Sequence, residues 1–461
     1  YEVKYFVDDN TVLNGCNISS VPIRNLDFLS KNSIYVDYIV LAIPSLSSED
    51  RRKILKRLQI YNIPVLTIPT ILELANKNVS TNLIKPINIE DLLGRDVVLP
   101  DSNLLRETVS KKIIFISGSG GSIGSELCRQ IVYSKPKRII LFDHNEHSLY
   151  KLFNELSSSF DGIELIPILG CATNLNLLLD IFAKYKVDII FHAAAYKHVP
   201  LVEFNPLTGL KNNISSSRSI CEAALQAKVS SAVLISSDKA VRPTNVMGAS
   251  KRISELIFQS YAEFITKSET FSTKFSMVRF GNVLNSSGSV LPLFTKQISE
   301  GGPVTITHKD MTRFFMTIPE AAQLVIQSSA LAKGGDLFLL DMGTPMKISE
   351  LAETIIKLSG FTIKSNENPK GEIEIIYTGL RPGEKLFEEL LIDSKSIPTI
   401  HPLIFRSEEP YISYVQFWPI LDELEKNLNA INKDETLKII LDCVSEAEFK
   451  SFYENNIIKK I

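Results

Sequence analysis

The sequence lacks the features of a disulfide-rich, metal-binding, membrane-spanning or nucleic-acid-binding chain. It has only five cysteines in 461 residues, and their spacing matches neither a disulfide framework nor a zinc site. No apolar run approaches the roughly 18 residues needed to cross a bilayer, and no signal peptide is visible. Fifty basic and 52 acidic residues give a formal net charge of −2, so no basic surface for nucleic acid is expected. The composition indicates a globular protein of a reducing, cytosolic environment, without a metal.

Residues 112–126 (KIIFISGSGGSIGSE) carry the most informative pattern. An apolar, β-branched run predicts a buried parallel strand, and Gly118, Gly121 and Gly124 then precede an amphipathic helix. This pattern favours a dinucleotide, because the glycines admit the pyrophosphate and the helix N-terminus faces it. The alternative is a glycine turn that only connects two elements. A second strand ends in Asp143, where an acid would bind both ribose hydroxyls and repel a 2′-phosphate, so we predict NAD rather than NADP.

Strands and helices alternate after this motif, which predicts an α/β fold with a Rossmann-like, doubly wound parallel sheet. We expect strands at 113–117, 138–142, 163–168, 188–192, 232–236, 275–279 and 337–341, and helices at 122–133, 146–157, 174–185, 206–227, 247–266 and from 349.

The domain organisation follows from where this alternation starts and stops. Residues 1–93 resemble a small Rossmann-like α/β module, incomplete at its N-terminus and without a glycine fingerprint. We expect a linker at 94–110, an NAD-binding catalytic domain at 111–405 with a substrate lobe at about 281–400, and a helical C-terminal appendage at 406–461.

Three further segments carry chemical groups at predicted strand or helix ends. The first is HAAAYKH at 192–198, whose small alanines would let a cofactor pass closely; tight packing would explain the alanines but not the lysine and histidine. The second is SSDK at 236–239. The third, MGASK at 247–251, corresponds to the Tyr-x-x-x-Lys pattern of short-chain dehydrogenases, in which the lysine lowers the tyrosine pKa. Met247 takes the tyrosine position and cannot transfer a proton; the simpler interpretation is a helix start with Met247 in the core.

Five segments in order, GSGGSIGSEL, HAAAYKHVPLVE, SSDKAVRPTNVMGASKR, RFGNVLNSSGSV and GLRPGEKLFEELL, resemble the UDP-N-acetylglucosamine 4,6-dehydratases of bacterial capsule and glycan synthesis. The resemblance covers roughly 90–400. It is closest to the large branch of extended short-chain dehydrogenases in which methionine replaces the tyrosine and the C5 configuration is thought to be retained. It implies a membrane anchor upstream of residue 1, a place at the cytoplasmic face of the inner membrane, and a homo-oligomer.

The resemblance also implies a reaction, in which NAD⁺ takes hydride from C4 of the sugar, water leaves across C5 and C6, and hydride returns to C6. Asp238 would be the acid near O6 and Lys239 the base near C5, which would require a protonated carboxyl, a neutral amine and a dry pocket. Lys251 would hold the nicotinamide ribose. Ser237 or a water would relay the O4 proton in place of a tyrosine.

The binding residues implied by the resemblance form two sets. Those for NAD are Gly118, Gly121, Ser122, Ile123, Gly124, Asp143, Ala193, Ala194, Ala195 and Lys251. Those for UDP-N-acetylglucosamine are Lys197, His198, Asn282, Ser286, Ser287, Gly288, Arg313, Arg381 and Glu384, with Arg381 a plausible diphosphate clamp. For Arg313, Arg381 and Glu384, the alternative is a solvated surface charge.

Three departures from the family pattern are Asn285 in place of glycine, Ser237 in place of threonine, and Gly170-Cys171-Ala172-Thr173 where an acid near the adenine is common. Two other functions stay open. A nucleotide-sugar epimerase would share the fold and cofactor, but would need the tyrosine and no acid for C6. A non-catalytic scaffold of a glycan-assembly complex would explain Met247, but not the intact Asp238–Lys239 pair.

Overall fold

The structure, a computed structural model, describes residues 2–30, 35–68, 84–87, 100–160, 162–268, 270–286, 288–391 and 396–444. By its internal contacts the chain forms two compact units. The first unit comprises Tyr1–Val97, Val290–Lys309 and Lys347–Thr378, and the second comprises Val98–Ser289, Asp310–Met346 and Gly379–Ile461. Among the described residues, no helix combines the length and apolar character required to cross a membrane.

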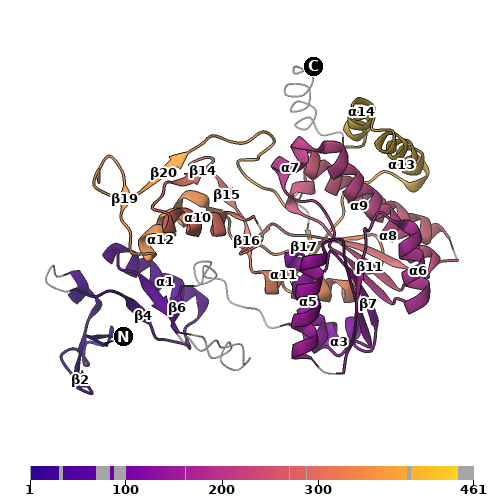
Figure 1. The fold of residues 1–461 in the computed structure, drawn as a ribbon. Helices are drawn as coiled ribbons and strands as arrows, with labels where there is room; N and C mark the ends of the chain where they lie inside the picture. Colours follow the sequence, from indigo (N-terminus) through magenta and orange to yellow (C-terminus); the bar gives the residue numbers. More distant parts are fainter. Residues whose placement is uncertain are drawn as a thin grey trace. The chain divides into compact units, whose positions relative to one another are not determined.

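A nine-stranded sheet forms the centre of the second unit (Figure 1). Its strand order is β21-β22-β17-β12-β11-β10-β7-β8-β9, and the seven strands from β17 to β9 run parallel. Because β7 lies between β8 and β10, the order reverses there, as in a dinucleotide-binding fold, and ligands of such sheets bind at the carboxyl ends of the strands near that point. The predicted Rossmann-like fold is confirmed.

The strands of this sheet are short and mostly buried on both faces. They are β7 (Ile113–Ser117), β8 (Arg138–Asp143), β9 (Glu164–Leu169), β10 (Ile189–His192), β11 (Ser231–Ile235), β12 (Lys274–Arg279), β17 (Asp336–Leu340), β21 (Ser396–Pro398) and β22 (Ile404–Ser407). Two short strands, β13 (Asn282–Val283) and β16 (Phe315–Met316), pair beside it, and β15 (Thr312–Arg313) lies between them in sequence.

Helices cover both faces of the sheet, so β7 alternates between two apolar cores. Ile113 and Phe115 face one core and Ile114 and Ile116 the other. The first core includes α6 (Leu175–Tyr185), α8 (Pro206–Gln226), α9 (Val246–Lys267), α13 (Tyr414–Asn429) and α14 (Lys433–Cys443). The second includes α3 (Ser102–Val109), α4 (Ser122–Tyr133), α5 (Glu146–Ser159) and α11 (Ile318–Leu331). The short helices α7 (Val199–Phe204) and η4 (Asp238–Ala240) follow the ends of β10 and β11.

The first unit contains small sheets, three α-helices and two 3-10 helices among its described residues. Its elements are β1 (Phe6–Val7), β2 (Asn17–Ile18), β3 (Val21–Arg24), η1 (Leu26–Ser30), β4 (Ile39–Leu41), α1 (Ser48–Leu58), η2 (Gln59–Tyr61), β5 (Val65–Thr67), β6 (Lys85–Pro86), α10 (Val290–Ser299), β14 (Val304–Ile306), α12 (Ile348–Leu358), β19 (Ile363–Lys364) and β20 (Ile373–Tyr377). β18 (Met346–Lys347) spans the sequence boundary between the units.

The units divide the chain differently from the expected domain boundaries. Residues 290–309 and 347–378, expected in the substrate lobe of the catalytic domain, form one compact unit with the N-terminal module. The Gln59 side chain donates to the Thr354 hydroxyl at 3.3 Å, and Gly360 packs closely on Pro64. The functional domain boundaries themselves stay a prediction.

Two further segments differ from expectation. The expected linker 94–110 contains α3, whose Leu104 and Val109 are buried; its residues 94–99 lie outside the described part of the chain. The expected C-terminal appendage contributes α13 and α14 to the core of the second unit, and its residues 445–461 lie outside the described part.

Candidate active site

The glycine turn after β7 brings backbone segments into close approach. Gly118 has a φ of +68°, and a Cβ there would lie 2.7 Å from the backbone nitrogen of Ala194. A Cβ at Gly124, in the first turn of α4, would lie 2.0 Å from the carbonyl oxygen of Gly118. Glycine is therefore needed at both positions. The buried Ser119 hydroxyl in the same turn has no hydrogen-bond partner among the residues that the structure describes.

The start of α4 leaves its N-terminal backbone groups without a side-chain cap. Gly121 is the N-cap residue, and Ser122 and Ile123 open the first turn, as the sequence predicted. The first backbone N–H groups of a helix have no partner within the helix, and they carry its positive dipole end. They are suited to bind a phosphate.

Asp143 lies beside this turn at the end of β8. Its side chain is almost fully buried, Oδ2 accepts from the backbone nitrogen of Gly120 at 2.8 Å, and Oδ1 accepts from that of Asn145 at 2.8 Å. The turn, its unpartnered hydroxyl and this acid at the end of the neighbouring strand fit the predicted dinucleotide.

His192 ends β10 directly opposite Ser117 of β7. The imidazole is buried, and its Nδ1 lies 2.7 Å from the Ser117 hydroxyl. Burial, together with the nearby Lys251 charge, lowers the pKa of His192 to about 3, so the ring is neutral near pH 7. Ala193, Ala194 and Ala195 follow it, half-buried, and the first two lie against the glycine turn.

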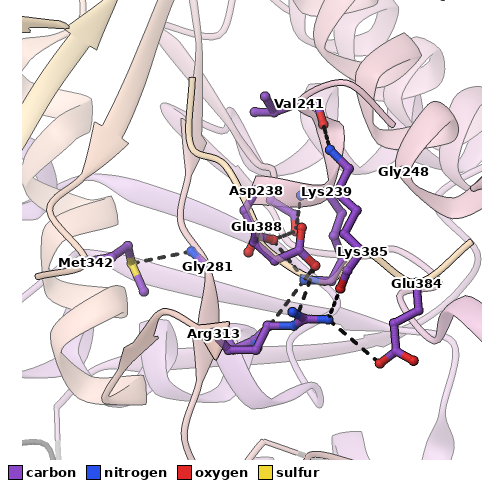
Figure 2. Close-up of polar contacts among 12 residues, drawn as sticks. Asp238, Lys239, Val241, Gly248, Gly281, Arg313, Met342, Glu384, Lys385 and Glu388 are labelled. Carbon is purple, nitrogen blue, oxygen red and sulfur yellow. Dashed lines mark hydrogen bonds and ion pairs between the residues drawn. The ribbon is translucent and has the colours of Figure 1, made fainter. Parts of the chain in front are cut away.

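Asp238 and Lys239 form an ion pair just beyond the end of β11 (Figure 2). The Lys239 amine lies 2.9 Å from Oδ1 of Asp238, and the Ser237 hydroxyl donates to the same oxygen at 2.8 Å. Asp238 is 1% exposed, yet its Oδ2 finds no hydrogen-bond partner in the described part of the chain. A Cβ at Gly281 would lie 3.3 Å from that oxygen. One carboxylate oxygen is therefore held by hydrogen bonds, and the other is buried without one.

A neutral Lys239 amine, which the role implied by the resemblance requires, is not the form that the neighbouring groups favour. Desolvation favours the uncharged form, but the negative charges of Asp238 and Glu388 outweigh it and raise the pKa of Lys239. These charges favour the ammonium form of Lys239, whose proton is shared with Asp238 through their 2.9 Å hydrogen bond.

Glu388 is a second carboxylate at this pair, and the sequence analysis did not identify it (Figure 2). Its Oε1 lies 3.5 Å from the Lys239 amine and 3.7 Å from Nε of Arg313. Its side chain is 4% exposed, and its Oε2 has no hydrogen-bond partner among the described residues. Glu388 stands in the segment GLRPGEKLFEELL, but nothing in the sequence distinguishes it from the neighbouring glutamates.

Arg313 joins the segment around Glu388 to β15. Nη1 donates to the carbonyl oxygens of Thr312 and Leu386, and Nη2 donates to that of Lys385 at 2.8 Å. The guanidinium also lies 3.7 Å from Oε1 of Glu384. These contacts hold the loop; the expected substrate contact of Arg313 stays a prediction.

The start of α9 packs against Asp238 and Lys239. A Cβ at Gly248 would lie 2.3 Å from the Lys239 carbonyl oxygen, so only glycine permits this approach. Met247 is 2% exposed and belongs to the apolar core, as the simpler interpretation of residues 247–251 expects. The Lys251 amine donates to the carbonyl oxygen of Ile235 at 2.7 Å, and burial lowers its pKa to about 8.

The predicted sugar-binding residues are only partly brought together. Oδ1 of Asn282 accepts from the Lys239 amine at 3.2 Å. Burial lowers the pKa of Lys197, and the nearby positive charge of Lys239 lowers it further. Gly288 has a φ of +71°, and a Cβ there would lie 2.5 Å from the His198 ring. Ser286, two residues before Gly288, is buried, whereas Ser287 lies outside the described residues.

The RPGEK segment lies over the start of α9. Gly383 has a φ of +73°, and its carbonyl oxygen accepts from the side chains of Thr244 and Asn245 at 2.8 and 2.9 Å. Oε2 of Glu384 accepts from the backbone nitrogen of Arg381 at 3.1 Å. The Arg381 side chain is exposed, so its role as a diphosphate clamp stays a prediction.

Two departures from the family pattern have local explanations. Asn285 has a φ of +55°, a conformation that asparagine tolerates better than most residues other than glycine. A Cβ at Gly170 would lie 2.8 Å from the Phe142 ring, so this position is limited to glycine by packing. No cluster that could hold a metal ion occurs among the described residues.

Comparison with known proteins gives the family of the chain. Residues 114–409, more than half of the chain, match the family model described as polysaccharide biosynthesis protein. The chain belongs to this family. Over 87% of its length it is 43% identical to the capsular polysaccharide biosynthesis protein CapD of Staphylococcus aureus, but it spans only 65% of that protein.

Other relatives carry names of two different reactions. A UDP-N-acetylglucosamine 4,6-dehydratase (inverting) of Campylobacter jejuni is 31% identical, with 66% of this chain and 85% of that one covered. A UDP-glucose 4-epimerase of Rickettsia canadensis is 32% identical, with 61% and 77% covered. Among solved structures, that of Pen from Bacillus thuringiensis superposes with a TM-score of 0.58 at 30% identity, covering 68% of this chain and 99% of that one.

Proposed function

We propose that this member of the polysaccharide biosynthesis family is an NAD-dependent UDP-N-acetylglucosamine 4,6-dehydratase, a lyase that retains the C5 configuration. Its product would be UDP-2-acetamido-2,6-dideoxy-4-hexulose, a precursor for capsule, O-antigen or glycoprotein glycans. The observation that supports this most is the buried Asp238–Lys239 pair, with one carboxylate oxygen lacking a hydrogen bond among the described residues, beside a helix that carries Met247 where a tyrosine would serve an epimerase.

The glycine turn, Asp143 and the alanines after His192 would hold NAD. When bound, NAD takes hydride from C4 of the sugar and returns it to C6 after water has left. Asp143 would bind both ribose hydroxyls. The Lys251 amine donates a hydrogen bond to the Ile235 carbonyl oxygen. To reach the nicotinamide ribose, it would have to break this bond or donate to both acceptors.

The protein's own groups supply the acid and the base of the elimination. If the shared proton moves from Lys239 to Asp238 across their 2.9 Å contact, one step gives both a neutral amine and a protonated carboxyl. Lys239 then takes the C5 proton, the C–H electrons form the C5–C6 double bond, and the C6–O bond breaks as Asp238 protonates the leaving oxygen. This step restores the ammonium and the carboxylate.

Reduction completes the proton balance. Lys239 returns its proton to C5 as C6 becomes a methyl group, which leaves a neutral amine and a carboxylate. The proton released from O4 in the oxidation passes to solvent, and a proton from solvent then restores the pair to its one-proton state. The Ser237 hydroxyl, 2.8 Å from Oδ1 of Asp238, or a water would relay these protons.

An epimerase is the second candidate, because a relative with that name is as similar as the named dehydratase. An epimerase needs no acid for C6, so it would leave the buried Asp238 carboxyl without a role in the reaction. A non-catalytic scaffold is a third possibility, which the intact ion pair opposes.

The mass of the product distinguishes the three functions. The purified chain is incubated with UDP-N-acetylglucosamine without added cofactor, and the nucleotide sugars are analysed by mass spectrometry. We expect a product lighter by one water. An isobaric product would establish the epimerase, and unchanged substrate would favour the scaffold. Coupling constants in the proton spectrum of the product give the configuration at C5.

The setting of this activity is part of the proposal. Membrane association, a place at the cytoplasmic face of the inner membrane and a homo-oligomer are expected from the family resemblance. Separation of cell extracts into membrane and soluble fractions tests the first two, and light scattering of this chain tests the third.

A further inference from the structure

The Lys239 amine faces two carboxylates rather than one. Oδ1 of Asp238 lies at 2.9 Å and Oε1 of Glu388 at 3.5 Å from the amine, with Oδ1 of Asn282 at 3.2 Å as a third acceptor. Figure 2 shows Asp238, Lys239 and Glu388 gathered together. Asp238 adjoins Lys239 in η4, whereas Glu388 comes from a segment about 150 residues later in sequence, just after RPGEK. This approach of a remote carboxylate is not needed for the Asp238–Lys239 pair to form.

The charged groups around Lys239 come from four segments. Asp238 lies on its own element, Lys197 follows β10, Arg313 lies in β15, and Glu388 follows the RPGEK loop, where Glu384 also contacts Arg313. Lys197 and Arg313 disfavour an ammonium at Lys239, and the two carboxylates favour it. Glu388 therefore helps to balance the positive charge of the Lys239 amine, which Asp238 would otherwise have to balance alone.

Glu388 itself is fixed in place. It lies 3.7 Å from the Arg313 guanidinium, which is held by three backbone carbonyl oxygens. Its second oxygen is buried without a hydrogen-bond partner among the described residues, so Lys239 and Arg313 are the cations that its charge acts on. A carboxylate held this way changes the charge state of an amine without contacting the reacting atoms.

We propose that Glu388 is a positioning residue that acts through Lys239: it orients the amine toward Asp238 and keeps the shared proton on the pair up to alkaline pH. This rests on the proposed dehydratase function for its effect on turnover, but not for its effect on the charge of Lys239. The elimination needs one proton on the pair. Loss of that proton would stop the reaction, and Glu388 delays that loss as the pH rises.

The test compares Glu388→Gln with Glu389→Gln. Both remove one negative charge from adjacent positions, but Glu389 is 44% exposed and pairs with Arg242 on the surface at 3.2 Å. In Glu388→Gln we expect the alkaline limb of the pH profile of kcat to move down by about one unit or more, the range expected from losing one nearby opposite charge. Glu389→Gln should keep the wild-type profile. Glu388→Asp keeps the negative charge but moves it away from Lys239, because the side chain is shorter. The alkaline limb of this variant should lie between those of wild type and Glu388→Gln.

A second readout does not depend on activity. Each protein is labelled briefly with acetic anhydride across a pH series, and the acetylation of Lys239 is measured by peptide mass spectrometry. The pH of half-maximal labelling should fall in Glu388→Gln by the same amount as the kinetic limb. Lys426, whose side chain is 78% exposed, serves as the internal reference in every sample.

The outcomes separate this inference from the proposed function. A labelling shift without any dehydrated product from the wild type would support the charge role of Glu388 and reject the dehydratase. Dehydration with an unchanged profile and unchanged labelling in Glu388→Gln would overturn the role of Glu388. If Glu388→Gln does not fold, Glu388→Asp decides: wild-type values for both readouts would overturn the inference.

Discussion

The residues of the candidate site differ in how completely the protein satisfies their polar atoms. Oδ1 of Asp238 accepts from both Lys239 and Ser237, while Oδ2 is buried and lacks a hydrogen-bond partner among the described residues. A buried carboxylate oxygen without a partner is unfavourable unless a ligand supplies a donor. The same holds for the Ser119 hydroxyl in the glycine turn. At these two atoms, a bound ligand would supply the hydrogen bonds that the described residues do not make.

The first prediction concerns the ion pair. Asp238→Asn keeps the shape of the side chain and removes the acid, and Lys239→Ala removes the base. Each should lower kcat by at least about 10²-fold, as expected for loss of a general acid or base. Substrate binding, measured by calorimetry, should largely remain. Near-wild-type turnover in either variant would show that its residue has another role.

The second prediction concerns Met247, which is 2% exposed and packed in the apolar core. Tyrosine adds several heavy atoms to a space filled by a thin side chain, and overpacking of this kind costs about 1–3 kcal/mol. Met247→Tyr should fold and keep its nucleotide without gaining activity. Met247→Leu, which conserves volume, should stay within about tenfold of the wild-type kcat/KM. A tyrosine variant faster than the parent would show that the tyrosine position is still functional.

At the scale of elements, the alternating strands and helices between β7 and β12 could be predicted closely, whereas α3, α7 and α11 were not expected. The helix expected at 122–133 is α4 with the same bounds, and the strand expected at 113–117 is β7. These elements are buried β-branched runs and amphipathic helices, whose signal lies within each segment. The antiparallel strands β21 and β22 have no such local signal, since they form by pairing with β17 and with each other.

The candidate site was predictable in part for the same reason. Asp238, Lys239 and Met247 adjoin predicted strand and helix ends, so position in sequence indicated position in the fold. Glu388 could not be found this way, because only the tertiary structure brings it near Lys239. The direction in which the pKa of Lys239 is shifted could not be read from the sequence either, because it depends on burial and on the charges of both Asp238 and the remote Glu388.

The third prediction concerns α13, which the sequence suggested was part of an appendage. Phe417 is fully buried in the core shared with α8 and α9, whereas Val415, two residues earlier, is 63% exposed. Phe417→Ala should lower the free energy of unfolding by about 3–5 kcal/mol. Val415→Ala should change it by no more than about 0.5 kcal/mol. Urea unfolding followed by circular dichroism measures both, and equal effects would show that α13 does not belong to the core.

At the scale of the whole molecule, the proposed reaction has no net change of oxidation state. The hydride taken from C4 returns to C6, so a bound cofactor need not leave between turnovers. Such a protein gains nothing from rapid exchange of its nucleotide. The close packing of the glycine turn, where Gly118 contacts both Gly124 and the segment after β10, is consistent with a tightly held cofactor.

The fourth prediction is therefore that the purified chain carries NAD(H) at about one per molecule, released on denaturation and identified by chromatography. Gly124→Ala tests the site, since a Cβ would lie 2.0 Å from the Gly118 carbonyl oxygen and must displace the turn. Val415→Ala, at an exposed position of α13, is the control. We expect Gly124→Ala to lose most of its nucleotide and Val415→Ala to keep it. NADP in the wild type would reject the argument from Asp143, because a carboxylate there repels a 2′-phosphate. Turnover by wild type without bound nucleotide would reject the internal hydride cycle itself.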